Sequence, residues 1–589
     1  MLMTPRSKGS GPMVLGINAA YHESAAALIQ GGRVLAAVEE ERLNRIKHGK
    51  RARIDNADSL PWGAIRTVLE LAGVTSRQLA AVAFSFQPGR RQRLIGLDPP
   101  GTVDARSGWG TDEGEATFDA AVRRVPHLIR HHLGLNPDAV EFVSHHVAHA
   151  ASSFFTSSFQ KAAVLVLDGI GEDATGWLGC GVGSRLRRLE TIEYPHSLGL
   201  LWERFAVFLG FDEYAAGKVM ALAAYGRADQ YEESLRKVLN VSDDPLATPI
   251  FCVDPAITRF RSSDVSGLEK LFGPRRRASE PPTNERFSGI ARALQLQTNQ
   301  AVIRVAERLA LKTREKVLCY SGGVALNCVA NAALRRSGLF DRFGMIGACH
   351  DAGTAIGAAL SVSLRIDPSR RVLEERGQRS DWGTDLADLE TCNTLNQMGI
   401  PYHRAPTPSL TAATALADGK IVGWVNGRME FGPRALGYRS LLGDPRRVEV
   451  RERLNRIVKK REPFRPFGAS VLAEAASNWF DLPQQATAAD SPDALMLFAY
   501  PVFPQRRPLI PAVVHVDGTC RLHVVHSATQ PEYHELISHF GSLTGVPLII
   551  NTSFNDHEPI VCSVADALTT AMRSGVDVLV LGNYVVNFD

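Results

Sequence analysis

The strongest constraint on the fold is a strand pattern that occurs twice in the sequence. Val14 to Val38 reads as an apolar strand, a polar turn, a second strand, a glycine turn and a third strand, and the same order returns from Ala162 to Tyr194. The Gly31-Gly32 pair between two apolar runs is typical of a tight hairpin. A repeated opening of this kind predicts two related α/β halves whose first turns face a shared cleft. Chance similarity between two sheet openings is the alternative that the pattern leaves open.

Two histidines stand just before the second copy of this pattern. His145 and His149 are four residues apart, so a helix would place both imidazoles on one face, one turn apart. Asp168 then ends an apolar run, and Asp351 stands at a similar strand-to-loop turn, as a cleft between two halves requires. Two nitrogens and a carboxylate oxygen suit a borderline divalent ion such as iron or zinc. Polar groups that merely line a helix are the plainer alternative.

A glycine-rich loop lies between these two carboxylates. In KVLCYSGGVALNCVANAALRRSG, an apolar strand enters Gly322 and Gly323, and a helix leaves the loop carrying Asn327. Such glycines let backbone N–H groups approach a phosphate closely at a helix N-terminus. No GKS or GKT follows, so this is not a Walker loop. The loop is therefore predicted to contact a nucleotide phosphate.

The sharpest charge asymmetry in the chain lies between Arg428 and Arg465, where twelve Arg or Lys residues face five Asp or Glu residues. A solvated helix face explains most of these charges. Arg434, Arg439 and Arg465 differ, because each stands among apolar or glycine neighbours, where an unpaired buried cation would be costly. Arginine suits planar, bidentate capture of phosphate or carboxylate oxygens. These three arginines are therefore predicted to bind an anion.

Length and charge limit the remaining choices. At 589 residues the chain is too long for one core, so at least two large domains are expected. A net charge of +4 is too small to indicate nucleic acid or membrane as a general partner. No run of eighteen apolar residues occurs and the start lacks a signal-peptide pattern, so a cytoplasmic protein is expected. Eight scattered cysteines support neither a disulfide framework nor a cysteine–zinc site.

Nine segments between Val14 and Tyr584 together resemble the NodU/CmcH family of O-carbamoyltransferases. In order, they are VLGINAAYHESAAAL, EEERLNRIKHG, SHHVAHAASSFF, LVLDGIGE, YSGGVALNCVAN, CHDAGTAIGAA, FGPRALGYRSLL, EPFRPFGASVL and LIINTSFN. The resemblance implies a duplicated ribonuclease-H-like domain of the actin and sugar-kinase type, close to TsaD, at residues 13–368. A linker at residues 369–384 and a YrdC-like α/β domain at residues 385–589 follow. Residues 1–12 are expected to be a disordered start.

The resemblance also implies two coupled reactions. The C-terminal domain is expected to make carbamoyl adenylate and pyrophosphate from carbamoyl phosphate and ATP, the latter with magnesium. The N-terminal domain then passes the carbamoyl group to a hydroxyl of a natural product, a secondary metabolite. The expected partners are therefore ATP, carbamoyl phosphate and a small hydroxylated acceptor, with no nucleic acid and no membrane. A homo-oligomer is compatible with the sequence, which does not identify the acceptor.

Family roles transfer to matching positions in this sequence. The family's metal ligands, with iron(II) as the ion, fall on His145, His149, Asp168 and Asp351. The general base falls on His22 and a cleft lysine on Lys47. The anion site falls on Arg434, Lys459, Arg465, Arg521, Asn551 and Ser553. Two positions depart from the family pattern: Ala20 stands where related members carry an Asp, and His523 stands where the HxDGTxRxQ motif has Gln.

Two other functions fit parts of the same pattern. A tRNA threonylcarbamoyl-type transferase uses both domain types, but it needs an exposed basic surface that the near-neutral charge disfavours. A non-catalytic, actin-like nucleotide-binding scaffold is disfavoured by the retained metal-ligand set and the arginine cluster. For the acceptor pocket, the aromatic segment from Tyr194 to Phe211 is a candidate, although a core helix is the simpler interpretation of it.

Overall fold

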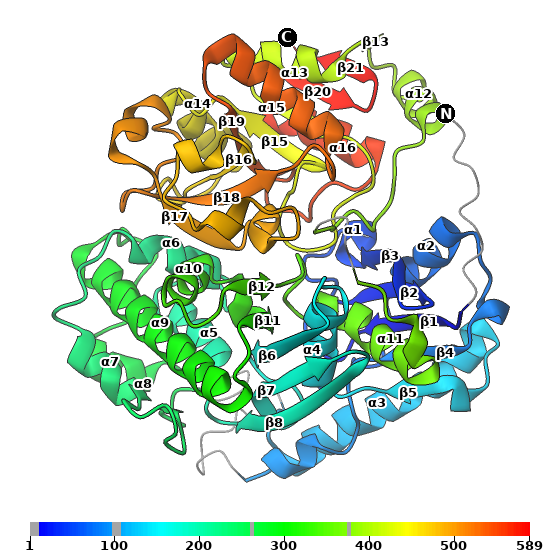
Figure 1. Ribbon diagram of the computed structural model, residues 1–589, viewed down its shortest axis with the longest axis vertical. Helices are drawn as coiled ribbons and strands as arrows, with labels where there is room; N and C mark the ends of the chain where they lie inside the picture. The colour runs from blue at the N-terminus through cyan, green and yellow to red at the C-terminus, as the bar shows by residue number, and fades with distance from the viewer. Residues whose placement is uncertain (1–10, 97–107, 259–263, 374–377, 589) are drawn as a thin grey trace.

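The computed structural model describes residues 11–96, 108–258, 264–373 and 378–588. Most of the expected disordered start, residues 1–12, therefore lies outside the described residues. Figure 1 shows one α/β layer, coloured yellow to red, above two further sheets coloured blue to green. No helix in the described ranges is long and apolar enough to cross a membrane.

The first sheet has five strands in the order β3-β2-β1-β4-β5. They are β1 (Met13–Asn18), β2 (Ala25–Gln30), β3 (Arg33–Glu39), β4 (Ala81–Phe84) and β5 (Val140–Phe142). β1, β2 and β3 form an antiparallel meander, while β4 pairs parallel to β1 and β5 parallel to β4. The predicted hairpin at Gly31-Gly32 is confirmed, because both glycines have positive φ, at 50° and 77°.

The second sheet repeats this topology, with the order β8-β7-β6-β11-β12. Its strands are β6 (Lys161–Leu167), β7 (Ala174–Val182), β8 (Arg185–Glu193), β11 (Val317–Ser321) and β12 (Arg342–Gly344). The first three strands are again an antiparallel meander, and the last two are again parallel. The predicted duplication is therefore confirmed: two ribonuclease-H-like sheets, each made of a meander followed by two parallel strands.

Two helices join the two sheets. α4 (His145–Phe155) packs on β6 and β11, α11 (Ala352–Ile366) packs on β1 and β2, and the two helices pack against each other. The close contact between the helices requires glycine at position 357, since a Cβ on Gly357 would lie 1.7 Å from the Ala148 carbonyl oxygen. The N-terminal ends of α4 and α11 are thereby held near the end of β6.

The last third of the chain builds a nine-stranded mixed sheet in the order β13-β21-β20-β14-β15-β19-β16-β18-β17. Its strands are β13 (His403–Arg404), β14 (Val422–Val425), β15 (Arg439–Gly443), β16 (Gly468–Leu472), β17 (Phe498–Pro501), β18 (Thr519–Val525), β19 (Leu548–Ser553), β20 (Val578–Leu581) and β21 (Tyr584–Asn587). Helices α13 (Pro408–Ala417), α15 (Pro531–Thr544) and α16 (Val564–Ser574) pack on it. The fold class is thus α/β throughout, as predicted.

The remaining helices surround the first two sheets or follow them in sequence. They are α1 (Glu41–Asn44), α2 (Trp62–Ala72), α3 (Asp112–Leu133), α5 (Leu198–Phe208), α6 (Ala216–Ala223), α7 (Glu232–Val238), α8 (Ser266–Phe272), α9 (Glu285–Thr313), α10 (Cys328–Arg336), α12 (Asp388–Gln397) and α14 (Val448–Arg453). A short two-stranded sheet is formed by β9 (Leu239–Val241) and β10 (Phe251–Val253).

Buried arginines connect the nine-stranded sheet region to the rest of the protein. Arg42 donates to the Gly432 carbonyl at 2.8 Å. Arg335 on α10 pairs with Asp493 and donates to the Tyr500 hydroxyl at 2.7 Å. Both guanidinium groups are almost inaccessible to water, so each needs a buried carboxylate to offset the cost of burial. Arg42 finds Glu39 on its own side, whereas the carboxylate of Arg335 comes from across the interface.

A third buried arginine supports the turn after β1. Arg91 makes two hydrogen bonds to Glu115, at 2.7 and 2.8 Å, and donates to the Tyr21 hydroxyl at 2.7 Å. Tyr21 in turn donates to the Gly171 carbonyl in the turn after β6. The two equivalent turns of the duplicated sheets are therefore tied together through one bidentate ion pair.

Replacing Glu115 tests how much the Arg91–Glu115 ion pair contributes to the stability of the fold. We expect Glu115→Ala to lower the free energy of unfolding by about 3 kcal/mol, because it leaves the Arg91 guanidinium buried and unpaired. Urea unfolding of the purified variant measures the change. The control is Asp55→Ala, which breaks the exposed Arg53–Asp55 pair and should leave the unfolding midpoint unchanged. Equal effects of the two substitutions would show that this ion pair does not support the fold.

Candidate functional site

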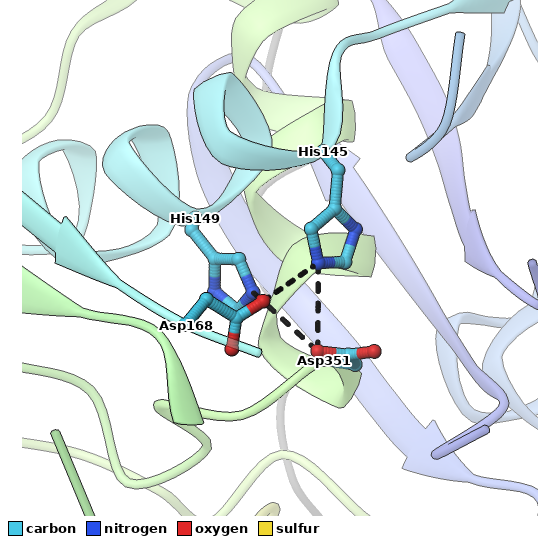
Figure 2. A group of neighbouring side chains, drawn as sticks. All are labelled: His145, His149, Asp168 and Asp351. Carbon is cyan, nitrogen blue, oxygen red and sulfur yellow. Dashed lines mark hydrogen bonds and ion pairs between the residues drawn. The ribbon is translucent and has the colours of Figure 1, made fainter. Parts of the chain in front are cut away.

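The four predicted metal ligands meet at the ends of three elements (Figure 2). Both histidines come from α4, Asp168 follows β6, and Asp351 precedes α11. His145 Nε2 lies 3.3 Å from Asp168 Oδ2 and 3.5 Å from Asp351 Oδ1. His149 Nε2 lies 3.6 Å and 3.5 Å from the same two oxygens. The four side chains thus converge from different parts of the chain on one point.

The donor set of this cage fits a divalent transition metal. Both histidine side chains are fully buried, and His149 Nε2 has no hydrogen-bond partner among the described residues. The other ring nitrogens have partners outside the cage: His145 Nδ1 lies 3.4 Å from the Ser85 carbonyl, and His149 Nδ1 lies 3.3 Å from the Ser321 hydroxyl. Such contacts orient the rings toward a metal. Two imidazole nitrogens and two carboxylate oxygens suit iron(II) or zinc.

The electrostatics of the cage favour a bound positive charge. Burial alone would lower the pKa of His145, but Asp351 and Asp168 raise it well above its usual value. Burial alone would raise the pKa of Asp168, but the two histidines hold it well below its usual value. The carboxylates therefore remain ionised in a site with little water, where a cation is strongly stabilised.

The glycine-rich loop contacts one of the cage ligands directly. The Gly323 N–H donates to Asp168 Oδ1 at 2.8 Å, and so fixes the carboxylate. A Cβ on Gly322 would lie 2.1 Å from the Leu167 carbonyl oxygen, and its φ of 96° also favours glycine. Asn327 caps α10. The nucleotide contacts expected of these three residues stay a prediction.

The predicted base, His22, borders the cage. Its Nδ1 lies 4.0 Å from Asp351 Oδ2. Its ring makes an edge contact with Tyr214, with the centroids 5.0 Å apart, and the His48 ring lies near both, 4.8 Å from Tyr214 and 6.2 Å from His22. Sequence reasoning missed Tyr214, because it lies in an irregular segment between α5 and α6 without a recognisable motif.

A cavity of about 680 Å³ opens between the nine-stranded sheet and the helices α6 and α10. Ser553 and five predicted cations line it: Lys47, Arg434, Lys459, Arg465 and Arg521. Arg461 also lines it, although the sequence analysis assigned that charged run to a solvated face. Arg461 donates to the Asn455 side chain at 2.7 Å and lies over the Phe467 ring, and no sequence signal separates it from its exposed neighbours.

Several cations of this cavity, among them Arg434, Lys459 and Arg521, have no ion-pair partner within the described residues. Burial and then the charge of Arg521 lower the pKa of Arg434 to about 9. Burial and the charges of Arg461 and Arg465 put the pKa of Lys459 well below its usual value. Within the described chain, Nε of Arg434 and Nε of Arg521 have no hydrogen-bond partner. A polyanion would satisfy these donors and relieve the repulsion between them.

Two predicted anion ligands lie elsewhere. Arg439 is fully buried outside the cavity, where its guanidinium donates to three carbonyl groups, those of Gly427, Tyr438 and Thr384, at 2.9 to 3.0 Å. Its apolar neighbours in sequence correctly indicated burial, but main-chain oxygens and the buried Glu430 carboxylate, rather than a ligand, offset its charge. Asn551 is also fully buried behind the cavity wall.

His523, which departs from the family pattern, has partners for both ring nitrogens. Its Nδ1 lies 2.9 Å from the Ser470 hydroxyl, and its Nε2 lies 3.0 Å from the Gln530 side-chain oxygen. Burial lowers the pKa of His523 to about 3, so the ring is neutral. Ala20, the other departure, is buried as well. Neither residue presents a charge to the cavity.

Charged side chains connect the cage to the cavity. Glu23 follows His22 in sequence and His350 precedes Asp351, and both line the cavity. His350 Nε2 lies 3.4 Å from Glu39, which also accepts from Arg42 at 2.6 Å. Because Arg42 and His350 pair with Glu39, and His48 pairs with Glu23 at 2.6 Å, we interpret the group as an ion-pair network rather than a second metal site.

The aromatic segment expected to border an acceptor pocket belongs to the core instead. α5 is mostly buried, and none of its described residues lines the cavity. Trp202 shows the reason, since its indole nitrogen donates to Thr298 of α9 at 2.9 Å. The simpler interpretation of this segment, a core helix, is therefore the correct one.

Comparison with known proteins gives matches over nearly the whole chain. Residues 13–360 match the family model described as carbamoyltransferase N-terminus, and residues 413–587 match the model described as carbamoyltransferase C-terminus. The nodulation protein NolNO of Sinorhizobium fredii is 37% identical over 97% of this chain and 79% of its own length. The nodulation protein NolO of Bradyrhizobium diazoefficiens is 36% identical over 75% of this chain and 78% of its own length.

Solved structures align more weakly. Full-length HypF in its phosphate- and nucleotide-bound form covers 62% of this chain and 57% of its own, with a TM-score of 0.35 and 11% identity. With both halves matched by family models and relatives more than one-third identical over most of the chain, this protein is an enzyme of the carbamoyltransferase family.

Proposed function

We propose that this carbamoyltransferase activates carbamoyl phosphate with ATP and transfers the carbamoyl group, through carbamoyl adenylate, to a hydroxyl of a natural product. One observation supports it above all. A cluster of cations, several of them without an ion-pair partner in the described chain, lines a cavity whose wall continues, through Glu23 and His350, to a buried cage of carboxylates and imidazoles. An anion-activating site and a transfer site would then lie side by side, joined by shared wall residues.

The cationic cavity suits the activation step. Carbamoyl phosphate first loses its phosphate to water, and the resulting carbamate oxygen attacks the α-phosphorus of ATP, so that pyrophosphate leaves. Arg434, Arg465 and Arg521 would bind phosphate oxygens and offset the charge that develops during this displacement. Lys459 holds the end of β19 in place, since it donates to the Ser553 and Asn555 carbonyls at 2.8 and 2.7 Å. Seclusion from bulk water would protect the reactive mixed anhydride.

The cage suits the transfer step. His22 would accept the proton of the acceptor hydroxyl as that oxygen attacks the carbamoyl carbon and AMP leaves. Asp351 lies close enough to influence the orientation of the His22 ring. A divalent ion held by His145, His149, Asp168 and Asp351, with iron(II) as our choice, would supply positive charge next to the adenylate phosphate. Because ATP is a substrate, we place the reaction in the cytoplasm.

The direct test is turnover with defined substrates. We expect the purified enzyme to release pyrophosphate when both ATP and carbamoyl phosphate are present, and not with either one alone. Mass spectrometry of a panel of hydroxylated natural products should then show the mass gain of one carbamoyl group. Pyrophosphate formation that does not depend on carbamoyl phosphate would contradict the proposal. Modification of bulk tRNA instead would favour a threonylcarbamoyl-type transferase.

Metal content tests the cage separately. His149→Ala removes one of four donors from a buried site, so we expect iron(II) or zinc binding to weaken at least 10-fold. Elemental analysis after anaerobic reconstitution and desalting measures it. The control is His539→Ala, which alters a histidine on α15, an element that contributes no ligand to the cage. This variant should keep the metal content of the wild type. Equal metal content in both variants would exclude the cage as the metal site.

A further inference from the structure

A carboxylate of the cavity wall, Glu462, belongs to the same loop as two of the cavity arginines. Glu462 lies between Arg461 and Arg465 in sequence and lines the cavity with them. Its Oε1 accepts from Lys218 of α6 at 2.7 Å. Lys218 also lines the cavity, so this ion pair reaches from the second-sheet side of the cavity to the nine-stranded-sheet side.

Glu462 is only half satisfied in this arrangement. Its Oε2 is buried, has no hydrogen-bond partner within the described residues, and lies 3.9 Å from the Arg465 guanidinium. Burial would raise the pKa of Glu462, but Lys218 lowers it, so the carboxylate stays charged. A buried acceptor without a partner is costly, and a contact of 3.9 Å to a cation recovers little of that cost.

Lys218 is held where it can exchange partners. Its ammonium lies 5.4 Å from the centre of the Phe211 ring, and Phe211 also contacts Phe464 of the arginine-bearing loop, with ring centres 6.3 Å apart. The flexible lysine stem allows the ammonium to turn from Glu462 toward the cavity without movement of α6.

We propose that Glu462 is a built-in counter-charge, which holds Lys218 and Arg465 until a polyphosphate enters, and that Lys218 then binds this polyphosphate from the side opposite the arginine cluster. The inference rests on the proposed function, since the triphosphate of ATP and the pyrophosphate product are the ligands. It adds a ligand contributed by α6, which the anion site implied by the family resemblance does not include. The two sides of the cavity would be drawn together by the substrate they share.

The proposal predicts opposite effects for the two partners. Lys218→Met keeps an apolar stem beside Phe211 but removes the charge, so affinity for inorganic pyrophosphate should fall about 10-fold. Glu462→Gln removes a competing negative charge, so the same affinity should rise about 5-fold. Isothermal titration calorimetry with inorganic pyrophosphate in metal-free buffer measures both. In a Lys218→Met background, Glu462→Gln should raise the affinity for pyrophosphate by clearly less, because no lysine is released to bind the ligand.

The matched control is the exposed ion pair Lys237–Glu233 on α7, 3.4 Å long. Lys237→Met and Glu233→Gln should leave pyrophosphate affinity unchanged, and thermal unfolding of every variant reports folding. Weaker binding by Glu462→Gln, or unchanged binding by Lys218→Met, would overturn the inference while leaving the proposed function intact. If the wild-type enzyme binds no pyrophosphate, the proposed function itself fails.

Discussion

The central constraint on this protein is a set of buried cations, including Arg434 and Arg521, that have no ion-pair partner within the described residues. Elsewhere its buried arginines have partners: Arg91 has Glu115, Arg335 has Asp493, and Arg439 has three carbonyl groups. In the cavity, burial and the charge of the neighbouring Arg521 lower the pKa of Arg434. A fold keeps such an arrangement at a cost to its stability, which a bound polyanion repays when it supplies the missing partners.

In the metal-ligand cage near the cavity, by contrast, groups of opposite charge face one another. There the carboxylate oxygens and imidazole nitrogens lie 3.3 to 3.6 Å apart. Two glycines make this geometry possible. Gly357 lets α11 approach α4, while Gly323 presents its N–H to Asp168. A sheet duplication alone would not create the cage, because its ligands come from helix starts and a strand end that only this helix packing brings together.

Much of this arrangement could be predicted from the sequence. The repeated meander, the hairpin at Gly31-Gly32 and the i, i+4 histidines are local patterns, and local patterns survive folding. Arg439 and Arg461 could not be assigned correctly, because the same residue type in a charged or apolar context can end on carbonyl groups or in a cavity. Only tertiary contacts decide this, and they also placed Tyr214 against His22 without any signal in the sequence.

The central claim is that two chemically different, neighbouring sites act in series. Parallel measurement of pyrophosphate release and of carbamoylated product in His145→Ala and Arg465→Ala variants tests it most directly. The account predicts that His145→Ala still releases pyrophosphate but transfers little carbamoyl group, while Arg465→Ala is impaired in both. Loss of pyrophosphate release in His145→Ala, together with normal release in Arg465→Ala, would contradict it.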